Sequence, residues 1–165
     1  MPNDDNPRRP LTATHEEPTI WVDDIEVGDV FDLGTVVADP DEILEFAKRY
    51  DPQWYHVDPD RAKESFWGGL IASGWWTGSS MMGLYARNFL SKIAPDASPG
   101  VENLRWRKAV YPGDELALQI TCVDKKTSSR GPHLETLTFD WELKRGDDVV
   151  VTMSGRGWFH KRPTD

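Results

Sequence analysis

The chain has 165 residues, of which 38% are hydrophobic and 28% charged, and these values are those of one soluble globular domain rather than of a disordered or membrane protein. Its 28 acidic residues outnumber its 19 basic ones, and the net charge of -9 disfavours nucleic acid and anionic membranes as partners. Cys122 is the only cysteine, which excludes an intramolecular disulfide and multi-cysteine zinc sites and fits a reducing cytoplasm.

Tryptophan is unusually frequent in this sequence, with eight indoles among aromatic residues that make up 11% of the chain. Each indole can bury a large apolar area and still needs a partner for its N–H group. The excess therefore predicts a large apolar pocket or an extensive subunit interface. The eight are Trp21, Trp54, Trp67, Trp75, Trp76, Trp106, Trp141 and Trp158.

The first 20 residues are polar and contain prolines, and they predict a flexible tail ahead of a folded domain over residues 21–165. No apolar stretch follows the charges of the first ten residues, so the tail is not typical of a secretory signal. A first short strand is expected at about residues 30–37. Asp39, Pro40 and Glu42 then predict a helix start, as N-cap, first helical residue and capping-box acid.

This first helix is expected to end at Asp51, because Pro52 disfavours the α conformation in the residue before it. Residues 51–57 are consequently predicted to be a loop, and Asp58 and Pro59 to open a second, short helix.

A long uncharged run follows at residues 66–86, and it predicts a central helix over approximately residues 74–90. The run is long enough to cross a bilayer, but its five glycines and four Ser or Thr residues make it much less apolar than a typical span. A helix that is uncharged all round is instead expected to be buried on every side.

The second half of the chain alternates between apolar and polar residues, which predicts about four long strands. In each of three successive strands, alternate residues are expected to share one face: Leu116, Leu118, Ile120 and Cys122, then Leu137, Phe139, Trp141 and Leu143, then Val149, Val151 and Met153. Short links between them indicate antiparallel pairing. The predicted fold class is therefore α+β, a single domain whose antiparallel sheet wraps around the long central helix.

Asp51 and His56 are the first candidate catalytic residues, because Pro52 keeps their segment off a helix and a loop can bring both side chains to one water. One of the two groups, the carboxylate or the imidazole, could take a proton there while the other gives one. The alternative is an aspartate that caps a turn and a histidine packed on Trp54.

Gly74 is the second candidate, since glycine allows a ligand close to the backbone and free N–H groups at a helix start stabilise negative charge. This suits an oxyanion, although a glycine needed only to turn the chain is an equally good interpretation. Trp75 and Trp76 stand where a phosphate-binding loop requires Lys and Ser or Thr, so that motif is excluded.

The run from Asp41 to Leu90 resembles the MaoC-like dehydratases, the group that contains the R-specific enoyl-CoA hydratases and adopts the hot-dog fold. Their signature is an Asp and a His separated by four residues, a His-Asp-Pro-like stretch and a glycine at the start of the central helix. Asp51, His56, residues 57–59 and Gly74 match it in order and spacing. Residues 105–114 (RWRKAVYPGD) resemble the family's strand and turn ending in Gly-Asp.

The resemblance implies a function as well as a fold. Asp51 and His56 would activate a water for reversible addition to the double bond of a 2-enoyl thioester such as an enoyl-CoA, and the Gly74 N–H would stabilise the thioester oxygen. It implies no metal and no redox cofactor. It also implies at least a homodimer with the site near the subunit interface.

The sequence departs from the family pattern at several positions, with Gln53-Trp54 in place of Asn-Pro, Ser73 before Gly74 in place of His, and Met82 in place of a small polar residue. These departures predict a reshaped pocket wall and leave the acyl substrate open. The residues expected to contact the substrate are Gln53, Trp54, Ser73, Trp75 and Trp76.

Arg105, Arg107 and Lys108 are candidates for binding the CoA phosphates, although a solvated strand face explains them equally well. A thioesterase is disfavoured, because hot-dog thioesterases commonly place an acid on the central helix and residues 66–95 contain no Asp or Glu. A hot-dog module that binds an acyl thioester or lipid without catalysis stays open as an alternative. The expected location is the cytoplasm.

Overall fold

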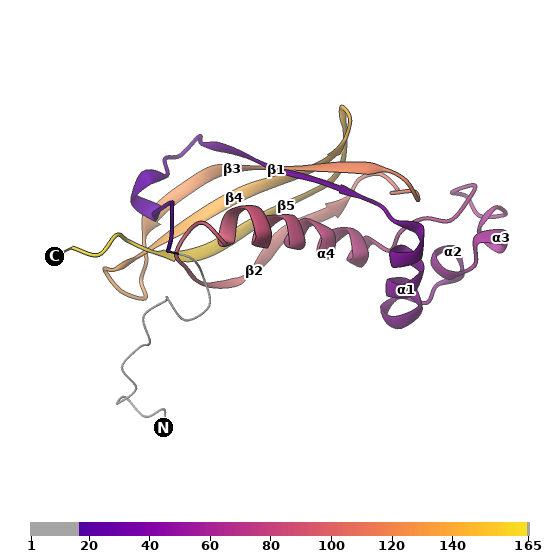
Figure 1. Ribbon diagram of the computed structural model, residues 1–165, viewed down its shortest axis with the longest axis horizontal. Helices are drawn as coiled ribbons and strands as arrows, with labels where there is room; N and C mark the ends of the chain where they lie inside the picture. The colour runs from indigo at the N-terminus through magenta and orange to yellow at the C-terminus, as the bar shows by residue number, and fades with distance from the viewer. Residues whose placement is uncertain (1–16, 165) are drawn as a thin grey trace, which may run out of the picture.

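Four strands from the second half of the chain and one from the first half form a single antiparallel sheet, against which the uncharged central helix packs (Figure 1). The computed structural model describes residues 17–164. The sheet has five strands in the order β1-β3-β4-β5-β2, so β1 and β2 are its edges. The strands are β1 (Val30–Val37), β2 (Pro95–Trp106), β3 (Glu115–Thr127), β4 (Leu134–Arg145) and β5 (Asp148–His160). The helices are α1 (Pro40–Tyr50), α2 (Trp54–Val57), α3 (Pro59–Ala62) and α4 (Gly74–Tyr85).

Helix α4 buries one side against the sheet, where Trp76, Met81 and Leu84 join a core that includes the inward residues of β3 and β4. The predicted α+β arrangement, a sheet around a central helix, is confirmed. The chain continues from α4 as a π-helical turn, Ala86–Leu90, so the helical run ends at the predicted residue with a wider last turn. Helices α1, α2 and α3 lie together beyond the N-terminal end of α4 (Figure 1).

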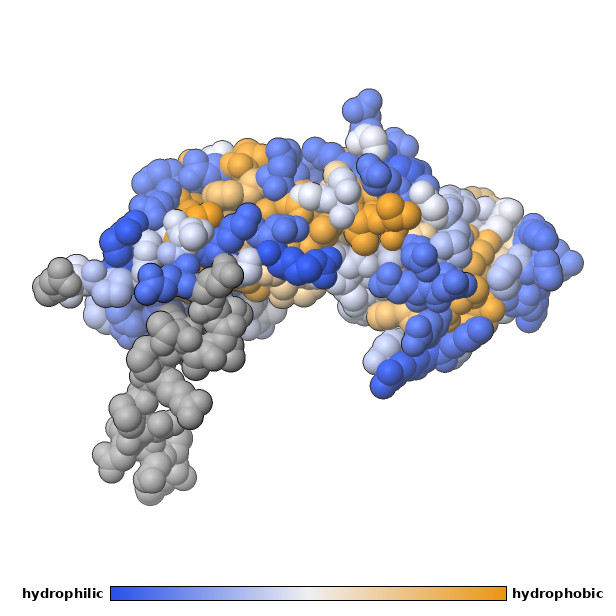
Figure 2. Space-filling view, viewed as in Figure 1, coloured by the Kyte–Doolittle hydropathy of each residue, from blue (hydrophilic) through white to orange (hydrophobic). Residues whose placement is uncertain are grey.

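The outer side of α4 differs from the prediction that this helix is buried on every side. Trp75 is 59% exposed and Met82 is 47% exposed. Figure 2 shows hydrophobic side chains gathered along the middle of this face, over α4 and β1. An uncharged helix surface is therefore left open in the single chain.

The local signals around α1 are largely confirmed, with two corrections. Asp39 caps the helix by accepting the amides of Asp41 and Glu42. The Glu42 side chain, predicted to complete a capping box, instead accepts the indole N–H of Trp76 at 3.3 Å. The predicted loop over residues 51–57 contains the single helical turn α2, because the chain returns to a helical conformation after Pro52.

Strand β5 also differs from simple alternation. A register shift against β4 at Leu143 and Lys144 places both Val150 and Val151 in the core, while Val149 is only partly buried. A bulge of this kind cannot be read from an alternating pattern, because it inserts one residue into one strand of a pair.

The predicted N-terminal tail falls mostly on residues 1–16, which lie outside the described residues. Its last part contacts the domain, since the amides of Thr19 and Ile20 both donate to the carbonyl of Lys92 at 2.9 Å. None of the helices within residues 17–164 has the length and apolarity needed to span a membrane.

Candidate active site

The candidate active site lies where the C-terminal end of α1, the turn α2, the start of α4 and the end of β2 meet. A cavity of about 360 Å³ opens there. Its wall combines ionisable groups with several aromatic rings. The lining residues used below are Asp51, Gln53, Tyr55, His56, Trp67, Gly74, Trp75, Trp106, Arg107 and Lys108.

Asp51 occupies the C-cap of α1, where Pro52 takes the chain out of the helix. Its carboxylate accepts two hydrogen bonds from other side chains. Ser73 Oγ donates to Oδ2 at 2.7 Å, and Gln53 Nε2 donates to Oδ1 at 2.8 Å. Tyr55 in turn donates its hydroxyl to Gln53 Oε1, which directs the amide nitrogen of Gln53 towards Asp51. The carboxylate is therefore held from both sides.

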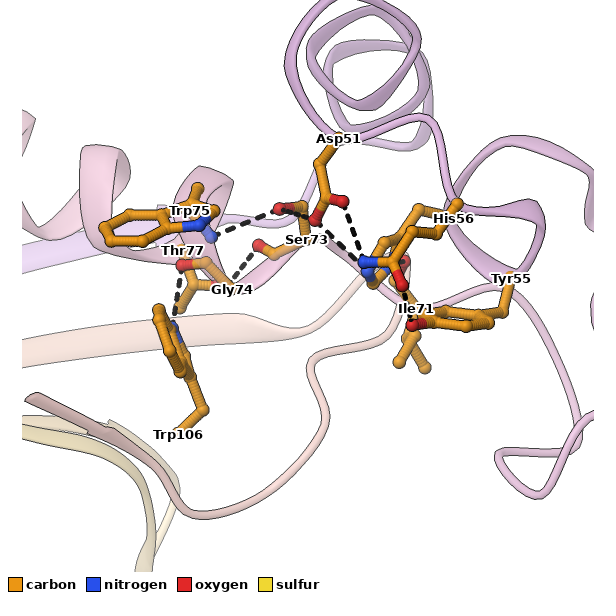
Figure 3. Close-up of polar contacts among 10 residues, drawn as sticks. Asp51, Tyr55, His56, Ile71, Ser73, Gly74, Trp75, Thr77 and Trp106 are labelled. Carbon is orange, nitrogen blue, oxygen red and sulfur yellow. Dashed lines mark hydrogen bonds and ion pairs between the residues drawn. The ribbon is translucent and has the colours of Figure 1, made fainter.

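His56 lies in α2 and is only 5% exposed. Its Nδ1 is 2.8 Å from the carbonyl oxygen of Ile71, and its Nε2 is 3.4 Å from Asp51 Oδ2 (Figure 3). A carbonyl oxygen only accepts hydrogen bonds, so Nδ1 carries a proton and donates a hydrogen bond to the Ile71 carbonyl. In the neutral ring, the basic nitrogen is then Nε2, the one that faces Asp51.

The pKa of Asp51 is lowered from its ordinary value. Partial burial acts to raise this pKa, but the hydrogen bonds from Ser73 and Gln53 and the charge that His56 carries when protonated together outweigh it. Asp51 is consequently ionised near neutral pH. A carboxylate and a basic imidazole nitrogen thus face each other at the cavity wall.

Gly74 begins α4 directly after Ser73, whose hydroxyl also accepts the Trp75 amide at 3.2 Å. The Ser73 carbonyl accepts both the amide and the hydroxyl of Thr77. The Gly74 amide has no hydrogen-bond acceptor among residues 17–164, as is usual for the first N–H groups of a helix. It is therefore available to stabilise a negative charge at the cavity, aided by the helix dipole.

Comparison with known proteins identifies the family. The MaoC like domain matches residues 8–139. The chain belongs to the MaoC-like dehydratase family. Among its relatives, the uncharacterized protein YdeM of Bacillus subtilis is 30% identical over 105 residues, which span 64% of this chain and 74% of YdeM. Protein MaoC of Klebsiella aerogenes is 32% identical over 85 residues, which cover 51% of this chain but only 25% of MaoC.

Solved structures of MaoC-like proteins share the fold. A MaoC-like dehydratase from Rhodospirillum rubrum is 30% identical, has a TM-score of 0.79 and matches over 88% of this chain and 99% of its own. An R-hydratase from Pseudomonas aeruginosa is 18% identical with a TM-score of 0.67, over 85% of each chain. The predicted hot-dog fold is thereby confirmed.

The predicted substrate contacts of this MaoC-like protein divide into two groups. Gln53 and Trp75 line the cavity. Trp54, Ser73 and Trp76 are not among the residues that line it. Trp76 is 1% exposed and points into the core, because consecutive residues of a helix face different directions. Trp54 packs against the guanidinium group of Arg61, and Ser73 is fully buried behind Asp51.

The predicted phosphate-binding residues also divide. Arg107 and Lys108 line the cavity, whereas Arg105 lines a neighbouring polar groove that Arg107 also reaches. Lys108 is paired with Asp148, and Arg107 Nε donates to Thr152 Oγ1 at 3.1 Å. Both cations lie at the rim of the site.

Three aromatic residues that line the cavity were not predicted from the sequence as site residues, namely Tyr55, Trp67 and Trp106. Tyr55 lies between Asp51 and His56 in the sequence, and this position could have predicted that it lies at the site. Trp106 stands in the run RWRKAVYPGD, but its contact with Gly74 spans 32 residues and has no local signature. Within residues 17–164, no group of three or more His, Cys, Asp or Glu could hold a metal ion.

Proposed function

We propose that this protein is a hydratase/dehydratase that adds water reversibly to the double bond of a 2-enoyl thioester, with an enoyl-CoA as substrate. The observation that carries the proposal is the separation of 3.4 Å between His56 Nε2 and Asp51 Oδ2 at the wall of an open cavity. Both atoms accept hydrogen bonds in these protonation states, so a water molecule that lies in the cavity beside the pair would donate a hydrogen bond to each. Such a water is both oriented and activated.

The proposed reaction needs one proton carrier. The water oxygen attacks the β carbon of the enoyl group while His56 Nε2 takes the water proton. The π electrons move to the α carbon and thioester, and the resulting enolate oxygen accepts a hydrogen bond from the Gly74 amide. The His56 imidazolium then returns the proton to the α carbon, so that one water has been added. Dehydration follows the same steps in reverse.

Asp51 acts in this scheme as an ionised partner rather than as the initial acid. Its lowered pKa keeps it charged, so it orients the water and stabilises the imidazolium that forms on His56. A backbone donor that stabilises the enolate oxygen contributes about 3 kcal/mol when it is well placed. Ser73 and Gln53 serve as positioning residues for the carboxylate.

The rim of the cavity supports a CoA thioester in particular. Arg107 and Lys108 lie beside the opening and offer charge-assisted hydrogen bonds to phosphate oxygens, and Arg105 extends the basic strip along β2. We expect no further cofactor.

The single, buried cysteine agrees with action in the cytoplasm.

The unpartnered surface supports a homodimer. Edge strand β2 has mostly exposed side chains, and the adjacent outer side of α4 exposes Trp75 and Met82. A second copy packed on this face would cover apolar area next to the site. We expect sedimentation velocity to show a dimer at micromolar concentration, and a monomer at all concentrations would contradict this part of the proposal.

The decisive test is hydration of crotonyl-CoA, or of a longer 2-enoyl-CoA, followed as loss of absorbance of the conjugated thioester. Asp51→Asn and His56→Ala should each lower the rate at least ~100-fold, the usual scale for general acid–base groups. Asp60→Asn is the matched control, because Asp60 lies nearby in α3 with its side chain 93% exposed. Wild-type rates in both site variants would refute the assignment.

A non-catalytic thioester-binding module is the alternative function, favoured by the departures at Gln53 and Ser73. It predicts that the protein binds an enoyl-CoA, measured by calorimetry, without converting it. A thioesterase has less support, because α4 carries no Asp or Glu. Release of free CoA from an acyl-CoA, detected with a thiol reagent, would support a thioesterase activity.

A further inference from the structure

Gly74 is held by an aromatic side chain that lies 32 residues further along the chain. The indole of Trp106, the last residue of β2, donates its Nε1–H to the Gly74 carbonyl at 2.8 Å (Figure 3). The same ring lies so close to Gly74 that a Cβ there would be 2.5 Å from Trp106 Cε2 and Nε1. Trp75 packs edge-to-face on this ring, with centroids 5.3 Å apart.

This packing explains why residue 74 is a glycine. Gly74 is not among the glycines with positive φ, so its backbone conformation is open to any residue. The contact leaves no room for a side chain, because real Cβ atoms do not approach other atoms to within 2.5 Å. The requirement for glycine is therefore imposed by Trp106 and not by the turn into α4.

The contact between Trp106 and Gly74 bears on the Gly74 amide, the group that is proposed to stabilise the thioester oxygen. Thr77 holds the carbonyl of Ser73, which belongs to the same peptide group as the Gly74 N–H. Trp106 holds the next carbonyl along the chain, that of Gly74 itself. The two peptide groups that flank Gly74 Cα are thus fixed from different elements, α4 and β2, and the direction of the Gly74 N–H is fixed with them.

We propose that Trp106 is a positioning residue for the Gly74 amide, which it aims into the cavity, and that its ring forms the cavity wall beside that amide. This inference rests on the proposed function, because it assigns the amide to the thioester oxygen. Trp106 acts through Gly74 rather than by donating to the substrate, since its N–H is already used. Misplacement of a reacting or stabilising group by about 1 Å can cost up to ~100-fold in rate.

The kinetic test separates positioning from simple packing. Trp106→Phe keeps a ring but removes the N–H, and it should lower kcat about tenfold while KM stays within about twofold. The matched control is Trp21→Phe, at the opposite end of the domain, which should leave both constants unchanged. An unchanged kcat in Trp106→Phe would overturn the proposal, as would a rise in KM alone.

A double-mutant cycle tests the steric link. Gly74→Ala should lower kcat at least ~100-fold, because the new methyl group and the indole cannot both keep their places. In the Trp106→Ala background the same methyl group has room, so Gly74→Ala should cost no more than about threefold further. Equal penalties in the two backgrounds would show that Trp106 does not impose the glycine.

One readout is independent of activity. In protein labelled with 15N-glycine, Trp106→Phe should shift the Gly74 amide resonance, while the resonances of glycines distant from β2 stay in place. If wild type hydrates no enoyl-CoA, the proposed function fails, and this spectrum together with thermal unfolding of the cycle still decides whether Trp106 holds Gly74. An unmoved Gly74 resonance would overturn the inference even in an active enzyme.

Discussion

The two ends of the central helix have opposite characters, although both pack on the same sheet. Around the N-terminal end of α4, the buried groups include the polar side chains of His56, Ser73 and Thr77. Around its C-terminal end, Phe89 is 1% exposed and packs against Phe31 with ring centroids 5.1 Å apart. One end keeps polar groups in place for chemistry, and the other supplies apolar packing.

This difference teaches how a small domain combines stability with a reactive site. Buried polar groups contribute little net stability and are costly if unpaired, whereas buried aromatic rings contribute both area and favourable ring contacts. Burial at the apolar end also raises the pKa of Tyr85, which stays neutral there. We therefore expect mutations at the C-terminal end to change stability and mutations at the N-terminal end to change activity.

The largest expected effect tests the apolar end. Phe89→Ala should lower the free energy of unfolding by about 3 to 5 kcal/mol, because it removes a large side chain from a packed cluster and leaves a cavity. Urea denaturation measures the loss. The folded fraction of the variant should retain kcat within about threefold at low temperature. A similar loss of kcat and stability in Phe89→Ala would show that the two ends are not separable.

A smaller effect is expected at the polar end, from the bond between Ser73 and Asp51. Ser73→Ala should lower kcat about tenfold with little change in KM, because Asp51 loses one of the two bonds that orient it. It should also raise the pKa of Asp51, so that kcat/KM begins to fall at a higher pH on the acid side. Ser154→Ala is the matched control, since its hydroxyl donates to Asp140 on the exposed surface.

The lowered pKa of Asp51 also makes the stability of the fold depend on pH. The folded pKa of Asp51 lies below its ordinary value of 3.8, so ionised Asp51 stabilises the fold at pH values above 3.8. That contribution is lost as the pH falls through the lower folded pKa. Thermal unfolding of wild type and Ser73→Ala should therefore differ more at pH 6 than at strongly acidic pH. A difference that is constant across this range would contradict the role of Ser73 in holding the charge.

The smallest effect is expected at the rim of the cavity. Arg107→Ala should raise KM for crotonyl-CoA about fivefold, since exposed charges contribute modestly and are screened by salt. KM for crotonyl-pantetheine, which lacks the nucleotide phosphates, should not change. Arg156→Ala, which removes an exposed arginine paired with Glu102, serves as the control. Equal changes in KM for both substrates would exclude phosphate recognition by Arg107.

Local features of the sequence were sufficient for much of this structure. Asp39 and Pro40 mark the start of α1, and Pro52 marks its end, because capping and proline sterics act over a few residues. The Asp-to-His spacing and Gly74 were enough to suggest the family and to locate the candidate site. Alternation predicted β3, β4 and most of β5, but not the bulge that brings Val150 into the core, and it does not describe β2, whose side chains are mostly exposed.

The sequence by itself determined both ends of α1, the start of α4, the antiparallel strands β3 to β5, the family and the pairing of Asp51 with His56 as a candidate, because each depends on residues that are near in the chain. Only the tertiary structure decided which tryptophans face the cavity. Trp76 turns into the core while Trp75 and Trp106 form the wall, and Trp106 reaches Gly74 across 32 residues. The tryptophan excess thus divides between core and pocket. Side-chain direction and long-range contact depend on how the sheet and helix pack, which no local pattern encodes.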